Sequence, residues 1–144
     1  MSVPNAKKTW YSDLPTPTAN PADISVSELR ALMDDPGLVA GRDYIVVDVR
    51  RTDLDEEPAI VVHPAAVNLP AQSFHQTLPM IFSLLHRIPK VILHCSSSKG
   101  RGPRCAGWYQ DYLDQQNCKT SAAYVLVGGI NAWRDAYPGS IVVI

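Results

Sequence analysis

Four short apolar runs rich in β-branched residues, separated by segments with helical spacing, constrain the fold of this chain most. The runs cover residues 44–49, 66–69, 91–94 and 123–127. The first has a single polar residue, near its end, and otherwise suits a strand buried on both faces. Strands of this kind that alternate with helices are typical of α/β proteins. The pattern therefore predicts an α/β sandwich around a largely parallel sheet.

Helix signals lie between and beside these runs. Ser25 and Glu28 have the spacing of a capping box, and the apolar residues after them predict a short helix. Further segments with helical spacing are 78–88, 103–115 and 130–136. Pro79 falls near the start of its segment, where a missing N–H costs little. We expect Trp133, in the last segment, to face the core.

The length of 144 residues predicts one domain with a core of its own. Residues 1–22 hold four prolines and predict an N-terminal arm, with Trp10 and Tyr11 as possible hooks onto the body. We expect residues 23–144 to form the domain that carries the chemistry. The formal net charge of -1 argues against nucleic acid or an anionic membrane as a partner.

Three cysteines, Cys95, Cys105 and Cys118, show neither zinc-finger spacing nor a CxxC pair. We therefore predict no metal site and no disulfide framework, and expect Cys105 and Cys118 to be structural. The N-terminal residues lack the apolar run of a signal peptide, and no apolar stretch is long enough to span a bilayer. These features favour the cytoplasm or the nucleus.

The segment 93–104, LHCSSSKGRGPR, is the most informative for chemistry. An apolar strand leads into Cys95, small polar residues follow, and a helix begins near Pro103. In open α/β sheets, ligands bind where strands end at their carboxyl side. A loop that turns into a helix N-terminus directs several backbone N–H groups at one point. The residues that would line this anion site are Ser96, Ser97, Ser98, Lys99, Gly100 and Arg101.

Within that segment, Arg101 can bind two oxygens of an oxyanion with its planar guanidinium. A cysteine surrounded by main-chain N–H groups and a cation is favoured as a thiolate, which is the nucleophilic form. A single cysteine after a strand is more often a buried small side chain. The convergence of small residues and Arg101 around Cys95 favours a nucleophile here. His94 could either tune the thiolate or pack beneath the loop.

The string His94-Cys95-x5-Arg101 resembles the H-C-x5-R signature of cysteine-dependent phosphatases, and the following Gly-Pro-Arg resembles the Cdc25 branch. Three further segments resemble the rhodanese fold that Cdc25 phosphatases share. They are 47–50, 63–70 and 128–133. Together the matches extend over residues 24–138 and indicate the group of small fungal Cdc25-like phosphatases and arsenate reductases. This resemblance implies a rhodanese-like three-layer sandwich with a mainly parallel central sheet.

The resemblance also implies a reaction. Cys95 would attack a phosphate monoester held by the loop and Arg101, and water would hydrolyse the cysteinyl-phosphate. His94 and Asp48 are expected to support the loop. The substrate would be a phosphorylated protein or a small phosphate or arsenate compound. Gly100 stands where animal Cdc25 has an acidic residue, and Val49 where it has a protective cysteine. Candidate general acids are the carboxylates of a charged stretch, Asp53, Asp55, Glu56 and Glu57.

Three alternatives stay open on the sequence. An arsenate reductase would use the same loop without a resident cofactor, and glutathione or glutaredoxin would serve as reductant and possible partner. A rhodanese sulfurtransferase is less compatible, because its loop is typically shorter than the five residues found here. A non-catalytic phosphate-binding module would not need both Cys95 and Arg101.

Overall fold

A computed structural model describes residues 9–51 and 60–144 of the chain. Its centre is a five-stranded sheet with the strand order β1-β6-β5-β2-β4, in which all neighbours pair in parallel. The strands are β1 (Ala22–Ile24), β2 (Tyr44–Asp48), β4 (Ala66–Asn68), β5 (Lys90–His94) and β6 (Ala122–Leu126). The four predicted strands are confirmed to within one residue at each end.

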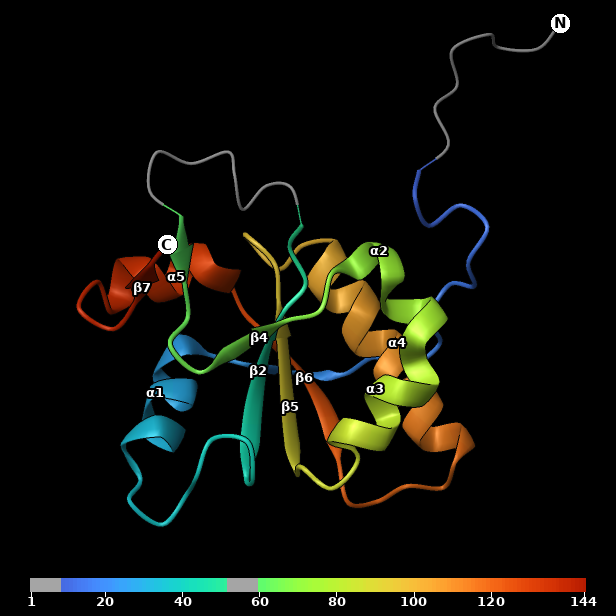
Figure 1. Ribbon diagram of the computed structural model, residues 1–144, viewed down its shortest axis with the longest axis horizontal. Helices are drawn as coiled ribbons and strands as arrows, with labels where there is room; N and C mark the ends of the chain where they lie inside the picture. Colours follow the sequence, from blue (N-terminus) through green and yellow to red (C-terminus); the bar gives the residue numbers. More distant parts are fainter. Residues whose placement is uncertain (1–8, 52–59) are drawn as a thin grey trace, which may run out of the picture.

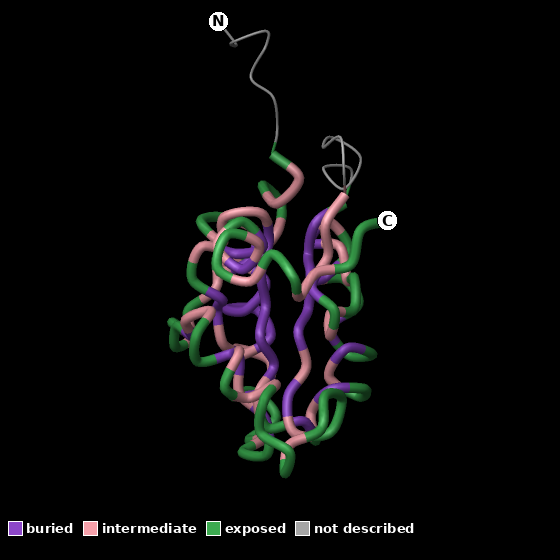
Figure 2. The backbone as a smooth tube through the Cα atoms, turned by 90° about the vertical axis from the view of Figure 1, so that its left-hand side faces the viewer, coloured by how far each residue is buried: buried purple, intermediate pink, exposed green. Residues whose placement is uncertain are grey.

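Helices cover both faces of this sheet (Figures 1 and 2). One face carries α1 (Val26–Asp34) and α5 (Gly129–Ala136), which pack on one core cluster. The other face carries α2 (Ala71–Phe74), η2 (His75–Thr77), α3 (Leu78–Leu85) and α4 (Arg101–Gln115), which pack on a second cluster. The predicted three-layer α/β sandwich with a mainly parallel central sheet is confirmed.

The alternation of side chains along β5 assigns residues to these two cores. Val91 and Leu93 pack with the α3 and α4 side, whereas Ile92 packs with the α1 and α5 side. Because side chains alternate along a strand, His94 points to the same side as Ile92. Cys95 follows directly and belongs to the cluster beneath α4.

The helix signals of the sequence are also confirmed. The amide of Glu28 donates to the Ser25 hydroxyl at 3.1 Å, and the Ser25 amide donates to the Glu28 carboxylate at 3.2 Å. Trp133 is fully buried. Helix α4 begins at Arg101, two residues before the predicted start, so Pro103 lies within its first turn. No helix among the described residues is both long and apolar enough to cross a membrane.

Some elements have no clear signal in the sequence. The strand β1 pairs with β6 across about 100 residues of chain, and it overlaps the predicted arm of residues 1–22. A two-stranded sheet pairs β3 (Val61–Val62) with β7 (Val142–Val143). Trp10 and Tyr11 pack against the core, as predicted for hooks. The boundary between arm and domain at residue 22 stays a prediction.

Candidate active site

Cys95 lies between the end of β5 and the start of α4, with residues 96–100 forming a loop of bends between them. Its side chain is buried, and the amide of Gly102 donates a hydrogen bond to Sγ with a nitrogen–sulfur distance of 3.4 Å. The sulfur therefore faces the N-terminal turn of a fifteen-residue helix. The partial positive charge of that helix end favours an anion at this position.

Helix α5 holds the start of the loop from the other side. The amide of Ile130 donates to the Cys95 carbonyl at 3.1 Å, and the amide of Asn131 donates to the Ser96 carbonyl at 3.1 Å. In a planar trans peptide the N–H points opposite to the C=O. The amides of Ser96 and Ser97 consequently point away from α5. Two N–H groups of the loop are thus oriented by contacts that do not involve a ligand.

Gly129 makes this close approach possible. A Cβ at this position would lie 2.4 Å from the Cys95 carbonyl oxygen and 2.6 Å from that of Ser96. Its φ of 60° is also in the left-handed region, which glycine adopts at little cost. The glycine pair of residues 128–129 resembles a rhodanese segment, but only the folded structure shows that it supports the loop.

Gly129→Ala is expected to displace the 96–100 loop and to lower activity. The added methyl group must push away two carbonyl oxygens, so we expect at least about a tenfold loss of kcat/KM and about 1–3 kcal/mol of stability. Aryl phosphate kinetics and urea unfolding would measure both effects. Gly139→Ala is the control, because a Cβ there meets nothing within 4 Å. Wild-type kinetics in the Gly129 variant would contradict the supporting role.

The other predicted loop residues are arranged around this anchored start. Ser96, Ser97 and Ser98 are half-buried, whereas Lys99 and Gly100 are exposed. Ser98 has a φ of 57°, a left-handed conformation that is uncommon for residues with a Cβ. Arg101 is half-buried at the first position of α4. The structure thus brings all predicted loop residues together between β5 and α4, and their roles stay predictions.

Asp48 lies next to the loop rather than in it. It is paired in register with His94 on the neighbouring strand. Its carboxylate accepts hydrogen bonds from the backbone amide and the guanidinium of Arg50, the shortest at 2.6 Å. The same guanidinium donates to the Val61 carbonyl at 2.9 Å. This buried ion pair fixes the chain as it leaves β2, and the support of the loop by Asp48 stays a prediction.

His94 is fully buried and bonds to the main chain of Cys95. Its Nδ1 lies 3.0 Å from the Cys95 carbonyl oxygen, so Nδ1 is the donor and Nε2 is the unprotonated nitrogen. A second buried ring, His63, shows the opposite tautomer, because its Nδ1 accepts from the Ala65 amide at 3.0 Å. Neither Nε2 has a hydrogen-bond partner in the described part of the chain. In the sequence, His63 is notable only as the first residue of segment 63–70, which resembles the rhodanese fold.

Lowering the pH is expected to destabilise the fold through these rings. Burial is the main cause that lowers the pKa of His63 to about 3, and the neighbouring His94 contributes. Burial also lowers the pKa of His94. Both rings have a pKa of about 6.5 in the unfolded chain, so below that pH the unfolded state binds more protons and is favoured. From about pH 7.5 to about pH 5, His63 alone should remove about 2 kcal/mol of stability.

Urea unfolding at several pH values would measure this slope. The variant His63→Gln should show a shallower dependence of stability on pH than the wild type over the same interval. An equal slope in wild type and His63→Gln would contradict the assignment.

The other cysteines, Val49 and the candidate acids singled out in the sequence are not assigned to the loop around Cys95. Cys105 is fully buried, and burial together with the nearby Cys95 raises the pKa of its thiol. Cys118 follows the far end of α4 and contacts the His86 carbonyl. Val49, at the place of the protective cysteine of animal Cdc25, is fully buried. The candidate acids Asp53, Asp55, Glu56 and Glu57 lie outside the described residues.

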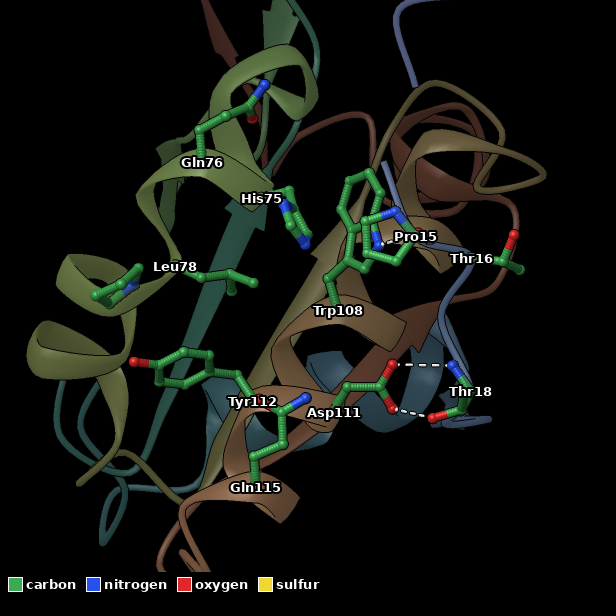
Figure 3. Close-up of a pocket in the computed structure, with 11 residues that line it drawn as sticks. Pro15, Thr16, Thr18, His75, Gln76, Leu78, Trp108, Asp111, Tyr112 and Gln115 are labelled. Carbon is green, nitrogen blue, oxygen red and sulfur yellow. Dashed lines mark hydrogen bonds between the residues drawn. The ribbon is translucent and has the colours of Figure 1, made fainter. Parts of the chain in front are cut away.

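A cavity of about 580 Å³ lies between α4, the segment of η2 and the start of α3, and residues 15–18 (Figure 3). His75, Leu78, Trp108 and Tyr112 form its apolar walls, and Asp111 stands at its edge with both oxygens bonded to Thr18. None of the predicted loop residues lines it. It is therefore separate from the candidate active site.

Comparisons with known proteins agree with this fold. No family model matches the chain. A solved yeast structure, described as a protein tyrosine phosphatase of the rhodanese family, superposes with a TM-score of 0.67 at 24% identity, covering 85% of this chain and 92% of the yeast chain. A rice protein (Oryza sativa subsp. japonica), arsenate reductase 2.2, is 32% identical over 114 residues, covering 77% of this chain and 80% of its own. The chain belongs to the rhodanese-fold family of arsenate reductases and Cdc25-like phosphatases.

Two other members of this family are similar over most of their length. Arsenical-resistance protein 2 of Saccharomyces cerevisiae is 31% identical over 100 residues, covering 65% of this chain and 75% of the yeast protein. The dual specificity phosphatase ibp1 of Schizosaccharomyces pombe is 26% identical over 126 residues, covering 75% of this chain and 83% of the S. pombe protein. The family suspected from the H-C-x5-R string is thereby confirmed.

Proposed function

We propose that the chain is a cysteine-dependent enzyme that hydrolyses phosphate monoesters on the 96–100 loop. The observation that carries the proposal is the contact between Cys95 Sγ and the amide of Gly102 at the start of α4. A sulfur in that position is favoured as an anion by the helix end. The same N–H groups and Arg101 would bind the equatorial oxygens of a phosphoryl group as it is attacked.

The proposed reaction has two steps. Cys95 Sγ attacks phosphorus in line with the leaving oxygen, forming an S–P bond as the P–O ester bond breaks. The departing oxygen takes up a proton, and water then attacks phosphorus and releases inorganic phosphate and the free thiolate. No carboxylate in the described part of the chain is assigned as the general acid. Aryl esters, whose leaving groups need little protonation, should therefore react faster than alkyl esters.

Arsenate reduction is the second candidate, because relatives at 31–32% identity carry arsenate reductase or arsenical-resistance names. Arsenate has the shape and charge of phosphate, so the same loop would accept it. Two thiols must supply the two electrons that convert arsenate to arsenite, with one oxygen leaving as water and one disulfide forming. Cys105 is buried and Cys118 lies at the far end of α4. We therefore propose that glutathione or glutaredoxin supplies the two thiols.

Side-by-side assays of an aryl phosphate and of arsenate with glutathione and glutaredoxin test both candidates. We expect hydrolysis of the aryl phosphate without any added thiol, and arsenite formation only when the thiols are present. Cys118→Ser should leave both rates unchanged. Arsenite formation without hydrolysis would make the chain a reductase only. Absence of both reactions, or cyanide-dependent turnover of thiosulfate alone, would refute the proposal.

A further inference from the structure

Two buried histidines, His63 and His94, lie on the same face of the central sheet, beneath α5. His94 ends β5 and points to the side of Ile92, which is the side that α1 and α5 cover. The ring of His63 packs on Trp133 of α5, with 4.3 Å between the ring centres, and Trp133 belongs to the same core cluster as Ile92. Both imidazoles are therefore enclosed between the sheet and one helix.

The buried ion pair of Asp48 and Arg50 connects the chain segments that carry the two rings. Asp48 is paired in register with His94 on the neighbouring strand. The guanidinium of Arg50 donates to the carbonyl of Val61, two residues before His63. His94 is also one of the neighbouring groups that lower the pKa of His63. The two rings thus belong to one buried polar cluster.

The main-chain bonds of the two rings fix opposite tautomers. A carbonyl oxygen only accepts, so the bond to Cys95 places the proton of His94 on Nδ1 and makes its Nε2 an acceptor. A backbone amide only donates, so the bond from Ala65 makes Nδ1 of His63 the acceptor and its Nε2–H a donor. Neither buried Nε2 has a hydrogen-bond partner within residues 9–51 and 60–144. One donor and one acceptor of matching sense are thus left in the same cluster, where burial without a bond costs free energy.

We propose that one buried water molecule joins Nε2–H of His63 to Nε2 of His94, and that His63 is a positioning residue for the reaction at Cys95. The inference rests on the proposed function, since it assigns a further residue to the same reaction. A buried water is stable where about two to four polar groups bond to it, and this pair supplies a donor and an acceptor. Because the water donates to Nε2 of His94, the proton of that ring stays on Nδ1.

The proton on Nδ1 of His94 orients the first peptide of the loop. The Cys95 carbonyl accepts from this Nδ1 at 3.0 Å and from the Ile130 amide at 3.1 Å. The N–H of Ser96 belongs to the same peptide plane and points the opposite way, toward the proposed oxyanion site. The other tautomer of His94 would place a lone pair against the Cys95 carbonyl and repel it. A change at His63 should therefore reach kcat through His94.

Long-range ¹H–¹⁵N NMR spectra of protein with labelled histidines report which ring nitrogen carries the proton. In the wild type at neutral pH we expect the Nδ1–H form of His94 and the Nε2–H form of His63. A high-resolution crystal structure should show one ordered water between the two Nε2 atoms. The opposite tautomer in either ring, or rings whose Nε2 atoms face apart with no water between them, would overturn the proposal.

Two substitutions of His63 separate hydrogen bonding from packing. The side-chain amide of His63→Gln can donate in place of Nε2–H, whereas His63→Leu fills the space without a donor. We expect His63→Gln to keep kcat for an aryl phosphate within about threefold, and His63→Leu to lower it at least about tenfold. In His63→Leu, His94 should populate both tautomers. Equal kcat values in wild type and His63→Leu, or an unchanged His94 tautomer in that variant, would also contradict the proposal.

His86→Leu is the matched control, because it removes a ring whose Nδ1 bonds to another main-chain carbonyl, that of Phe82, at the end of α3. It should leave kcat and the tautomer of His94 unchanged. Urea unfolding would establish that each variant is folded under the assay conditions. Should His63→Leu fail to fold, the wild-type spectra and the ordered water still decide the proposal.

The spectra also separate this inference from the proposed function. The expected tautomers, with that of His94 lost in His63→Leu, would support the link between the rings even if no aryl phosphate were hydrolysed. Hydrolysis at equal rates in wild type and His63→Leu would leave the proposed function intact and refute the positioning role of His63.

Discussion

Cys95→Ser is expected to lower the turnover of an aryl phosphate by at least about 10⁴-fold, as removal of a covalent nucleophile does in other enzymes. A serine hydroxyl stays protonated beside the Gly102 amide, so it offers no anion to attack phosphorus. The fold should be retained, because the substitution changes one buried atom at the end of β5. Initial rates with an aryl phosphate, together with urea unfolding of the same protein, would measure both.

The matched control is Cys118→Ser, which makes the same change at a half-buried thiol bonded to the His86 carbonyl at the far end of α4. This variant should keep the wild-type rate. If Cys95→Ser retained more than about a tenth of the parent activity, where loss of a nucleophile should cost several powers of ten, Cys95 would not be the nucleophile.

Arg101→Lys is expected to lower kcat/KM by about 10²–10³-fold, the typical effect of losing one oriented donor to a transition-state oxyanion. The lysine keeps the positive charge but replaces a planar pair of donors with a single ammonium. Because the interaction strengthens as charge moves onto the equatorial oxygens, we expect a larger effect on kcat than on KM. Steady-state kinetics with an aryl phosphate would resolve the two constants.

Arg134→Lys is the control for the Arg101 substitution. Arg134 is partly exposed on α5 and, within the described residues, forms an ion pair only with the neighbouring Asp135. It should show wild-type constants. An Arg101→Lys variant with wild-type kcat would mean that the guanidinium takes no part in the reaction.

Local patterns in the sequence were sufficient for four of the five strands of the central sheet and for the position of the loop. The runs that became β2, β5 and β6 are apolar enough to specify buried strands, since both faces of the sheet are covered by helices. The string from His94 to Arg101 places the candidate nucleophile at the end of such a strand. These features depend on near neighbours in the chain, and that is why they could be predicted.

Features that depend on distant contacts could not be predicted in the same way. The strand β1 has three residues and is defined by its pairing with β6, not by a pattern of its own. The support from Gly129 becomes visible only when α5 is seen against the carbonyls of Cys95 and Ser96. The path of residues 15–18 along α4 likewise depends on hydrogen bonds with the side chains of Trp108 and Asp111, more than 90 residues away.

The most direct test of the central claim is the mass of the protein during turnover. We would quench the reaction with an aryl phosphate by acid within a single turnover and map the modified peptide by mass spectrometry. The account predicts the added mass of one phosphoryl group on Cys95, appearing and disappearing at the rate of product formation. Turnover with an unmodified Cys95 throughout, or with the phosphoryl group on another residue, would contradict it.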